Sequence, residues 1–334
     1  MKLDFDNSQM SAHCESGALV NMLKYYHINI TEPMVFGIGS GYFFAHLPMI
    51  KMNYSPVTSF RILPGKLFSR TCRNLGVSFE SRTFNNPQQS MDELDRILDT
   101  GTPVGLQVGV FQLPYIPQEY RMHYNVHSMI VIGKENNEYI IADSVIPGEC
   151  RISREDLMRV RYAKGSFAPK GKMFYPTHVP KEIDFKQPVI RGIKKVCHDM
   201  LEIPMPIIGI KGIRYFSKKL RKWPLKNGNK VASQYLVQTI LSLEEIGTGG
   251  AGYRYMYGAF LSQAADLLGR EELKEVSIEM GKAGNRWRDF SQMGAKNCKN
   301  RSVPELTYDA IADIVLDVAD KEEKVFRKLK NIKL

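Results

Sequence analysis

Residues 126–143 read VHSMIVIGKENNEYIIAD and contain the clearest strand pattern in the first part of the chain. Two runs rich in apolar and β-branched residues, 126–133 and 138–143, are separated by the polar segment KENN, which is the pattern of a β-hairpin. His127 opens the first run and Asp143 closes the second. An antiparallel hairpin would therefore bring an imidazole and a carboxylate side by side.

The register of this hairpin decides whether the two side chains share a face. If Asp143 pairs opposite Met129, it lies on the same face as His127. A shift by a single residue would send the imidazole and the carboxylate to opposite faces. The favourable register requires a loop with an odd number of residues, three or five, between the strands, and the KENN segment permits such a loop.

A cysteine stands at the predicted start of the first helix. Apolar residues recur at three- and four-residue steps from Ala18 to Tyr26, which predicts a helix that begins close to Cys14. A helix N-terminus favours a thiolate, because the macrodipole and the free backbone N–H groups stabilise negative charge. Such a cysteine alone is more often a small buried apolar residue. With a histidine and a carboxylate it completes a Cys-His-Asp triad, so Cys14, His127 and Asp143 are the predicted catalytic residues.

An acyl-transfer site also needs hydrogen-bond donors for the developing oxyanion. The candidates are the backbone N–H of Cys14 and a side-chain amide from Gln9 or Asn7. His13 diverges from Cys14 if both belong to one helical turn, so we expect it to line the substrate site without acting as the base. The five cysteines include no CxxC pair, which predicts reduced thiols and no zinc site.

A glycine-rich run, VFGIGSGYFF at residues 35–44, is a candidate for substrate binding. It lacks the GK[ST] of a phosphate loop, so nucleotide binding is not expected. Its backbone could approach an acyl chain or a pantetheine arm closely, with Tyr42, Phe43 and Phe44 as apolar walls. Packing of the same aromatic rings in a core is an equally good interpretation.

A second glycine-rich run, GTGGAGYR at residues 247–254, offers another candidate. It could place a helix N-terminus at Gly250 and a fixed cation, Arg254, near a cleft, where they would hold a phosphate or a carboxylate. The alternative interpretation is a loop followed by a surface arginine.

The length and the pattern of elements predict two domains. A chain of 334 residues exceeds the size at which one core usually stops growing. The first part mixes short helices and strands, whereas the second runs helix after helix, and a proline-bearing stretch at 174–188 has the composition of a linker. We therefore predict an α+β domain with an antiparallel sheet at residues 1–180 and an all-α domain at residues 181–334.

The charge balance and the absence of long apolar runs restrict location and partners. A net charge of +11 suits an acidic partner, whether protein, nucleic acid or membrane surface. The basic stretch at 211–230 is most simply a solvated face or linker. The start of the chain lacks a signal-peptide pattern, and no stretch reaches about 18 uninterrupted apolar residues. We therefore expect a cytoplasmic protein without a membrane anchor.

The run AHCESGALVNMLKYYHINITEPMVFGIGSGYFF, followed later by VHSMIVIGKENNEYIIADS, resembles the N-terminal domain of the butirosin biosynthesis protein H family. The strand-end histidine and aspartate are also similar to those of C39-type papain-like peptidases. The similarity continues through TGTPVGLQVGVFQLPY and into GTGGAGYRYMYGAFLSQAADLLG, which resembles the helical domain that accompanies the first in that family. The resemblance implies a papain-like first domain and a helical domain that serves as a substrate or lid domain.

The same resemblance implies a function. It implies acyl transfer from the phosphopantetheine thioester of an acyl carrier protein to an amine or hydroxyl acceptor, in secondary-metabolite or lipid biosynthesis. Cys14 matches the nucleophile of the family, and His127 and Asp143 carry over through HSMIVIG and IIADS. Gln9 lies one residue nearer to Cys14 than the glutamine of the papain-like pattern. The enzyme would bind no cofactor of its own, and its partners would be an acidic carrier protein and a small-molecule or lipid acceptor.

Two other functions remain open from the sequence. A C39-like cysteine peptidase or amidase would use the same three residues on an amide bond. A non-catalytic nucleic-acid-binding protein would use the basic stretch at 211–230, where Tyr215 and Trp223 interleave the charges, although the chain has no recognised nucleic-acid-binding module.

Overall fold

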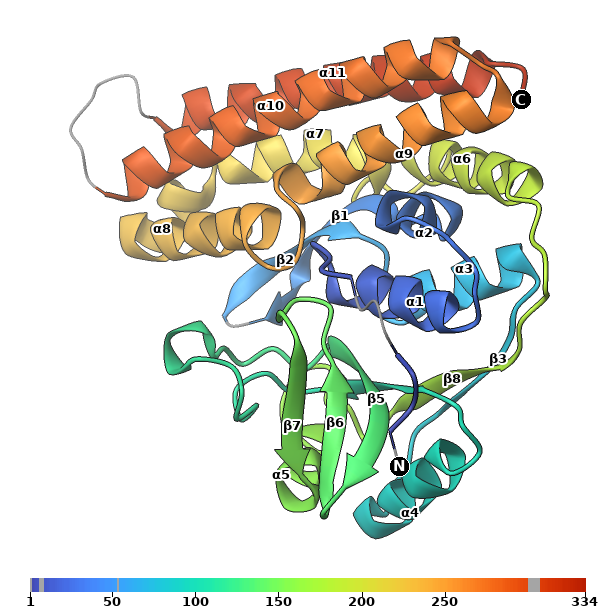
Figure 1. The fold of residues 1–334 in the computed structure, drawn as a ribbon. Helices are drawn as coiled ribbons and strands as arrows, with labels where there is room; N and C mark the ends of the chain where they lie inside the picture. Colours follow the sequence, from blue (N-terminus) through green and yellow to red (C-terminus); the bar gives the residue numbers. More distant parts are fainter. Residues whose placement is uncertain (1, 6–8, 53, 300–306) are drawn as a thin grey trace. The chain divides into compact units, whose positions relative to one another are not determined.

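The computed structural model describes residues 2–5, 9–52, 54–299 and 307–334 (Figure 1). The chain divides into two compact units, each built from two segments of sequence. Unit 1 comprises Met1–Val35 and Pro64–Ile183, and unit 2 comprises Phe36–Leu63 and Asp184–Leu334.

Unit 1 is an α+β structure built on a six-stranded sheet, in the order β3-β8-β4-β5-β6-β7. Every neighbouring pair of strands in this sheet is antiparallel. The predicted α+β class with an antiparallel sheet is thus confirmed. The elements of this unit are α1 (Cys14–Tyr25), α3 (Lys66–Leu75), β3 (Ser78–Arg82), α4 (Pro87–Leu98), β4 (Val104–Val108), η1 (Gln118–Tyr120), β5 (His127–Glu135), β6 (Glu138–Ala142), β7 (Glu149–Ser153), α5 (Arg154–Arg161) and β8 (Met173–His178); α2 (Glu32–Ile38) crosses from unit 1 to unit 2.

The two faces of this sheet carry different layers. Because side chains alternate along a strand, Met129 and Val131 of β5 face one side, where they join a buried cluster with Leu94 of α4 and Leu157 of α5. Helix α1 also packs against β5, and its residues from Cys14 to Leu23 are all buried. The first turn of α1 therefore lies close to the sheet strand that begins at His127.

The β5–β6 hairpin has a shorter turn than the sequence analysis predicts. Glu135 pairs with Glu138, so only Asn136 and Asn137 form the turn. Both have positive φ, at 47° and 65°, as a type I′ turn requires, and asparagine tolerates this conformation better than most residues. The expected loop of three or five residues is therefore wrong.

A β-bulge in β5 compensates for the short turn. On the turn side Gly133 pairs with Ile140, whereas on the other side Val131 pairs with Ile141. Ile132 is the extra residue, and it shifts the pairing by one position. The register beyond the bulge is therefore the one that the sequence analysis requires.

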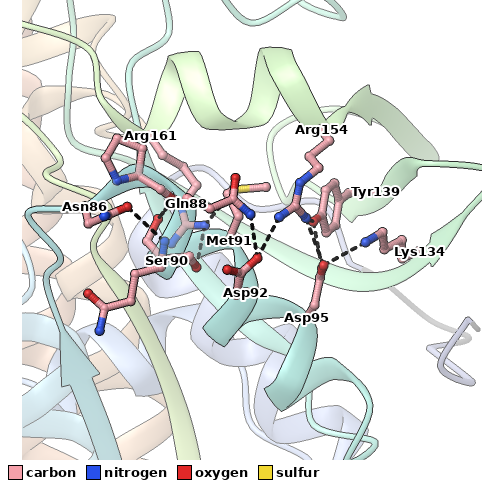
Figure 2. Close-up of polar contacts among 12 residues, drawn as sticks. Asn86, Gln88, Ser90, Met91, Asp92, Asp95, Lys134, Tyr139, Arg154 and Arg161 are labelled. Atoms are coloured by element: carbon pink, nitrogen blue, oxygen red, sulfur yellow. Dashed lines mark hydrogen bonds and ion pairs between the residues drawn. The ribbon is translucent and has the colours of Figure 1, made fainter.

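The turn side of the hairpin is held by a charged network around Asp95 of α4, which Figure 2 shows. One carboxylate oxygen of Asp95 accepts hydrogen bonds from Lys134 Nζ at 2.7 Å and Arg154 Nη1 at 2.8 Å, and the other accepts from the Tyr139 hydroxyl at 2.7 Å. Arg154 also pairs with Asp92 at 3.0 Å. Since Lys134 and Tyr139 are partners across the hairpin, Asp95 binds both members of one cross-strand pair.

Unit 2 contains the helices of residues 184–334, as the predicted all-α region requires, together with a β-hairpin that the sequence analysis places in the first domain. The hairpin, residues 42–61, packs within this unit against α7 and α8, and its Phe44 and Phe60 are buried. Residues 36–63 thus belong to unit 2, although the sequence analysis counts them with residues 1–180. The elements are β1 (Tyr42–Met52), β2 (Ser55–Arg61), α6 (Lys186–Leu201), α7 (Gly209–Leu220), α8 (Trp223–Glu244), η2 (Ala251–Tyr253), α9 (Arg254–Leu268), α10 (Glu272–Cys298) and α11 (Tyr308–Asn331).

The predicted linker at 174–188 is wrong in its first part, because Met173–His178 forms β8 inside the sheet. The contact boundary falls after Ile183 instead. Among the helices that the structure describes, none combines the length and the apolar character needed to cross a bilayer.

Replacing Asp95 by asparagine should lower the free energy of unfolding by about 2 kcal/mol at pH 7, because charge-assisted hydrogen bonds to three groups are weakened. Burial raises the pKa of Asp95, but Lys134, Tyr139 and Arg154 together hold this pKa below its ordinary value. The stabilisation is therefore present above the unfolded-state pKa and is lost as the pH falls through the folded-state pKa. Urea unfolding across this pH range measures it.

Asp99→Asn is the matched control, since Asp99 is an exposed residue at the end of the same helix. This control variant should be as stable as the unmodified chain. Equal stability of Asp95→Asn and Asp99→Asn at pH 7 would contradict the role given to the network.

Candidate active site

His127 and Asp143 meet at one end of the β5–β6 hairpin. Beyond the bulge, Ile130 pairs with Ala142, so the next position, Asp143, falls opposite Met129 and on the same face as His127. The Nε2 atom of His127 lies 2.7 Å from the Oδ2 atom of Asp143. Both side chains are buried, at 5% and 0% exposure. The structure thus brings together the predicted imidazole and carboxylate.

Burial and charge act in opposite directions on this pair. Burial lowers the pKa of His127, but the charge and the hydrogen bond of Asp143, together with a hydrogen bond to Cys14, raise this pKa well above its ordinary value. Burial raises the pKa of Asp143, but His127, the Val145 N–H and the Tyr115 hydroxyl bring the net pKa below its ordinary value. The pair therefore favours an imidazolium beside a carboxylate.

Cys14 is the first residue of α1, as the sequence predicts, and its side chain is buried. Its Sγ atom lies 4.0 Å from the carbonyl oxygen of Val126, the residue directly before His127. Cys14 also acts on the pKa of His127 through a hydrogen bond and through charge. All three residues predicted for the triad therefore converge, from the head of one helix and from two neighbouring strands.

His13 is a helix cap. Its Nδ1 atom accepts a hydrogen bond from the Ser16 N–H at 3.3 Å and lies 3.0 Å from the Ser16 hydroxyl. Its own backbone N–H donates to Glu32 Oε1 at 2.9 Å, and the N–H of Ala12 donates to Glu32 Oε2 at the same distance. These bonds fix the chain directly before Cys14, and they explain why His13 is not the imidazole beside Asp143.

The side chain of Gln9 does not reach the head of α1, which contradicts its predicted place in the oxyanion hole. Its Oε1 atom accepts a hydrogen bond from Lys24 Nζ at 2.7 Å, and its backbone N–H donates to Asn21 Oδ1 at 2.8 Å. Lys24 lies in the last turn of α1, about 15 Å along the axis from Cys14. Asn7 lies outside the described residues. The backbone N–H of Cys14 remains a candidate donor, because first-turn N–H groups have no partner within the helix.

Tyr42, Phe43 and Phe44 belong to unit 2, where the structure favours core packing over a substrate wall. The Tyr42 ring is fully buried, with its centroid 4.9 Å from that of Tyr257. Phe44 is also fully buried and stacks on Trp287 at 6.1 Å, while Phe43 is half-buried. The prediction that Tyr42 and Phe44 line a substrate site is therefore wrong.

The glycines of the same run serve close packing. A Cβ atom added to Gly37 would lie 2.2 Å from the Phe260 ring, so only glycine allows this approach within unit 2.

Arg254 and Gly250 do not form an anion site. The Arg254 side chain is fully buried and donates to both carboxylate oxygens of Glu322, at 2.8 and 3.2 Å. Its guanidinium lies 4.6 Å from the centroid of the Tyr42 ring. The Gly250 N–H donates to the Thr248 hydroxyl at 3.0 Å inside a turn. Since the arginine is already neutralised inside the unit 2 core, the predicted phosphate or carboxylate anchor is wrong.

Tyr115 is a further residue of the site, which sequence analysis missed. Its hydroxyl donates to Asp143 Oδ2 at 3.0 Å, and it lies 3.2 Å from the Met129 sulfur. Val145 donates its N–H to the other oxygen of Asp143 at 3.2 Å. Tyr115 lies in a loop without regular structure, so neither periodicity nor spacing indicates this contact. Among the described residues, no group of three or more histidines, cysteines or carboxylates is arranged to hold a metal.

The α+β fold of unit 1 and its buried cysteine, histidine and aspartate define the class of a cysteine-type enzyme domain. Residues 13–144 match the family described as butirosin biosynthesis protein H, N-terminal, which confirms the resemblance noted from the sequence. Residues 155–329, more than half of the chain, match the domain of unknown function DUF4872, and the chain belongs to this family.

A solved structure from Bacillus anthracis, described as a C39-like peptidase, shares 14% sequence identity with this chain. The alignment covers 53% of this chain and 97% of that chain, with a TM-score of 0.38. No curated protein matches the sequence.

Replacing Tyr115 by phenylalanine should raise the pKa of His127. The Tyr115 hydroxyl lowers the pKa of Asp143 by binding the oxygen that also faces His127. Without this hydroxyl, Asp143 attracts the imidazolium proton more strongly, so His127 loses that proton at a higher pH. Titration of the His127 ring protons by NMR measures the shift.

Tyr25→Phe is the control, because its hydroxyl donates to the carbonyl of Gly101 instead. This variant should leave the His127 titration unchanged. A His127 pKa in Tyr115→Phe that is equal to or below the pKa in the unmodified chain would overturn the assignment.

Proposed function

We propose that this protein is an acyltransferase that moves an acyl group from an acyl-carrier-protein thioester to an amine or hydroxyl acceptor, through a thioester on Cys14. The observation that carries the proposal is the convergence of Cys14, His127 and Asp143 in one buried site. The match of residues 13–144 to the butirosin biosynthesis family supports a biosynthetic role over a degradative one.

In this proposal His127 acts as the general base for Cys14. Its Nε2 atom faces Asp143, so Nδ1 is the nitrogen that remains for the thiol. Because the pair favours the imidazolium, His127 holds the thiol proton before the attack, and the Cys14 thiolate attacks the carbonyl carbon of the acyl thioester. The tetrahedral intermediate collapses, the carrier thiolate leaves and takes the proton from His127, and Cys14 holds the acyl group.

The second half-reaction uses the same groups in the reverse sense. The acceptor amine or hydroxyl attacks the Cys14 thioester while His127 removes its proton, and that proton returns to the Cys14 sulfur as the product leaves. Asp143 stabilises the imidazolium in both steps. The phosphopantetheine arm arrives and departs with the carrier protein, so in this proposal it is part of the substrate.

Transfer rather than hydrolysis requires that water stays away from the acyl-enzyme. Cys14 is 6% exposed and His127 is 4% exposed, which supports transfer. Whether the helical domain acts as a lid stays a prediction. A net charge of +11 supports an acidic carrier as donor, because complementary charge accelerates encounter.

Incubation with an acyl-carrier thioester should add one acyl group to the unmodified protein, located at Cys14 by intact mass and peptide mapping. Cys14→Ala should form no adduct, and His127→Gln should slow acylation at least about 100-fold, because proton transfer by a positioned base is lost. Cys298→Ala, which changes a half-buried cysteine of unit 2, is the matched control and should react normally. No adduct, or an adduct that persists in Cys14→Ala, would refute the proposal.

Raising the ionic strength should slow acylation by the carrier-bound thioester but not by the same acyl group on free pantetheine, because only the carrier docks through charge. Equal salt dependence of the two donors would contradict charge-guided docking. Cleavage of peptides without any carrier would instead favour the cysteine peptidase alternative.

A further inference from the structure

A cavity of about 40 Å³ lies beside the candidate active site, within unit 1. Its lining includes Glu15, which directly follows Cys14, and Val126 and Ser128, which flank His127. The Cys14 sulfur lies 4.0 Å from the carbonyl oxygen of Val126. An acyl group bound to that sulfur would therefore have this cavity as its neighbour.

The cavity has an apolar wall on one side. The side chains of Ser128 and His127 alternate along β5. The Ser128 side chain therefore lines the cavity from the face of the sheet opposite to the His127 side chain. The wall consists of Phe68, Phe79 and Phe174, with ring centroids 4.6 Å apart for Phe68 and Phe174 and 5.2 Å apart for Phe68 and Phe79. These packed rings give the cavity a rigid surface for carbon atoms.

Two charged side chains, Glu15 and Lys172, line the same cavity. Glu15 is 3% exposed, and its Oε1 atom accepts a hydrogen bond from the Phe68 N–H at 3.0 Å, which fixes the carboxylate. Lys172 is half-buried: burial lowers its pKa, the Glu15 carboxylate raises it, and Lys66 lowers it. Within the described part of the chain, Lys172 Nζ has no hydrogen-bond partner, so its N–H donors are available to a ligand.

We propose that this cavity receives the acyl group and that Lys172 selects short acyl groups that carry a neutral oxygen acceptor, such as a hydroxyl, close to the thioester. This inference rests on the proposed acyl transfer through Cys14. A water molecule needs a cavity volume of at least about 10–15 Å³. This cavity of about 40 Å³ therefore admits about three non-hydrogen atoms.

The charge balance selects the chemistry of the acceptor. The fixed Glu15 carboxylate lines the same cavity, so it would repel an anionic group placed there. A purely apolar acyl group would leave the Lys172 donors without a partner. A hydroxyl on the carbon next to the thioester carbonyl satisfies these donors without changing the net charge.

The test compares lactoyl-pantetheine with propionyl-pantetheine, which differ by one hydroxyl. The unmodified protein should be acylated at Cys14 about tenfold faster by the lactoyl thioester. Lys172→Met should remove this preference, because methionine keeps the bulk of the side chain but has no donor. Lys170→Met, which changes an exposed lysine two residues away, should keep the preference.

Equal rates with the two thioesters in the unmodified protein would overturn the inference, as would a preference that survives in Lys172→Met. If neither thioester acylates Cys14, the proposed acyl transfer fails. The binding of small amides to the cavity then tests its selectivity separately. NMR titration should show lactamide, but not propionamide, perturbing the ring signals of Phe68 and Phe174, with the effect lost in Lys172→Met. Identical responses to the two amides, or no response, would end the cavity proposal.

Discussion

One extra residue in strand β5 makes the candidate site possible. The two-residue turn at Asn136 and Asn137, continued without interruption, would place Asp143 on the face of the sheet opposite to His127. The bulge at Ile132 shifts the pairing by one position and returns the carboxylate to the imidazole. The carbonyl of Ile132 accepts a hydrogen bond from the Leu3 N–H at 2.8 Å, so the interrupted backbone keeps a partner. The turn and the bulge are thus complementary, and the site depends on both.

Buried charges recur in both units, but their surroundings differ. In unit 2, Arg254 and Glu322 satisfy each other, and Trp287 Nε1 donates to the same carboxylate at 2.8 Å, so the charge is fully used inside the core. In unit 1, Asp143 is occupied on both oxygens, but only one nitrogen of His127 is used by it. The remaining nitrogen is the one able to exchange a proton with a thiol. The two buried pairs therefore differ in one respect: His127 keeps a second ring nitrogen for a group other than Asp143, and Cys14 lies beside it.

Much of the site follows from local patterns. The alternation of 126–133 and 138–143 predicts the hairpin, and the helical spacing after Cys14 predicts where α1 begins, because both patterns record which side chains are buried. The turn length was not predictable in the same way, since a bulge leaves the composition of a strand unchanged.

Contacts between segments far apart in the chain could not be predicted from the sequence. Tyr115 meets Asp143 only through the fold, and the burial of Arg254 depends on helices far along the chain. The prolines of residues 174–188 suggested a linker, yet Pro176 is tolerated within β8 because β4 pairs with this strand only as far as Phe174.

The division of unit 2 into two segments has a consequence for biosynthesis. Phe44 and Phe60 pack against Trp287, which the ribosome adds long after it has made them. At synthesis rates of about 5–20 residues per second, these aromatic rings wait on the order of ten seconds or more for their partner. During that interval the apolar hairpin of the nascent chain must not aggregate. In addition, neither unit corresponds to one continuous fragment that could be produced separately.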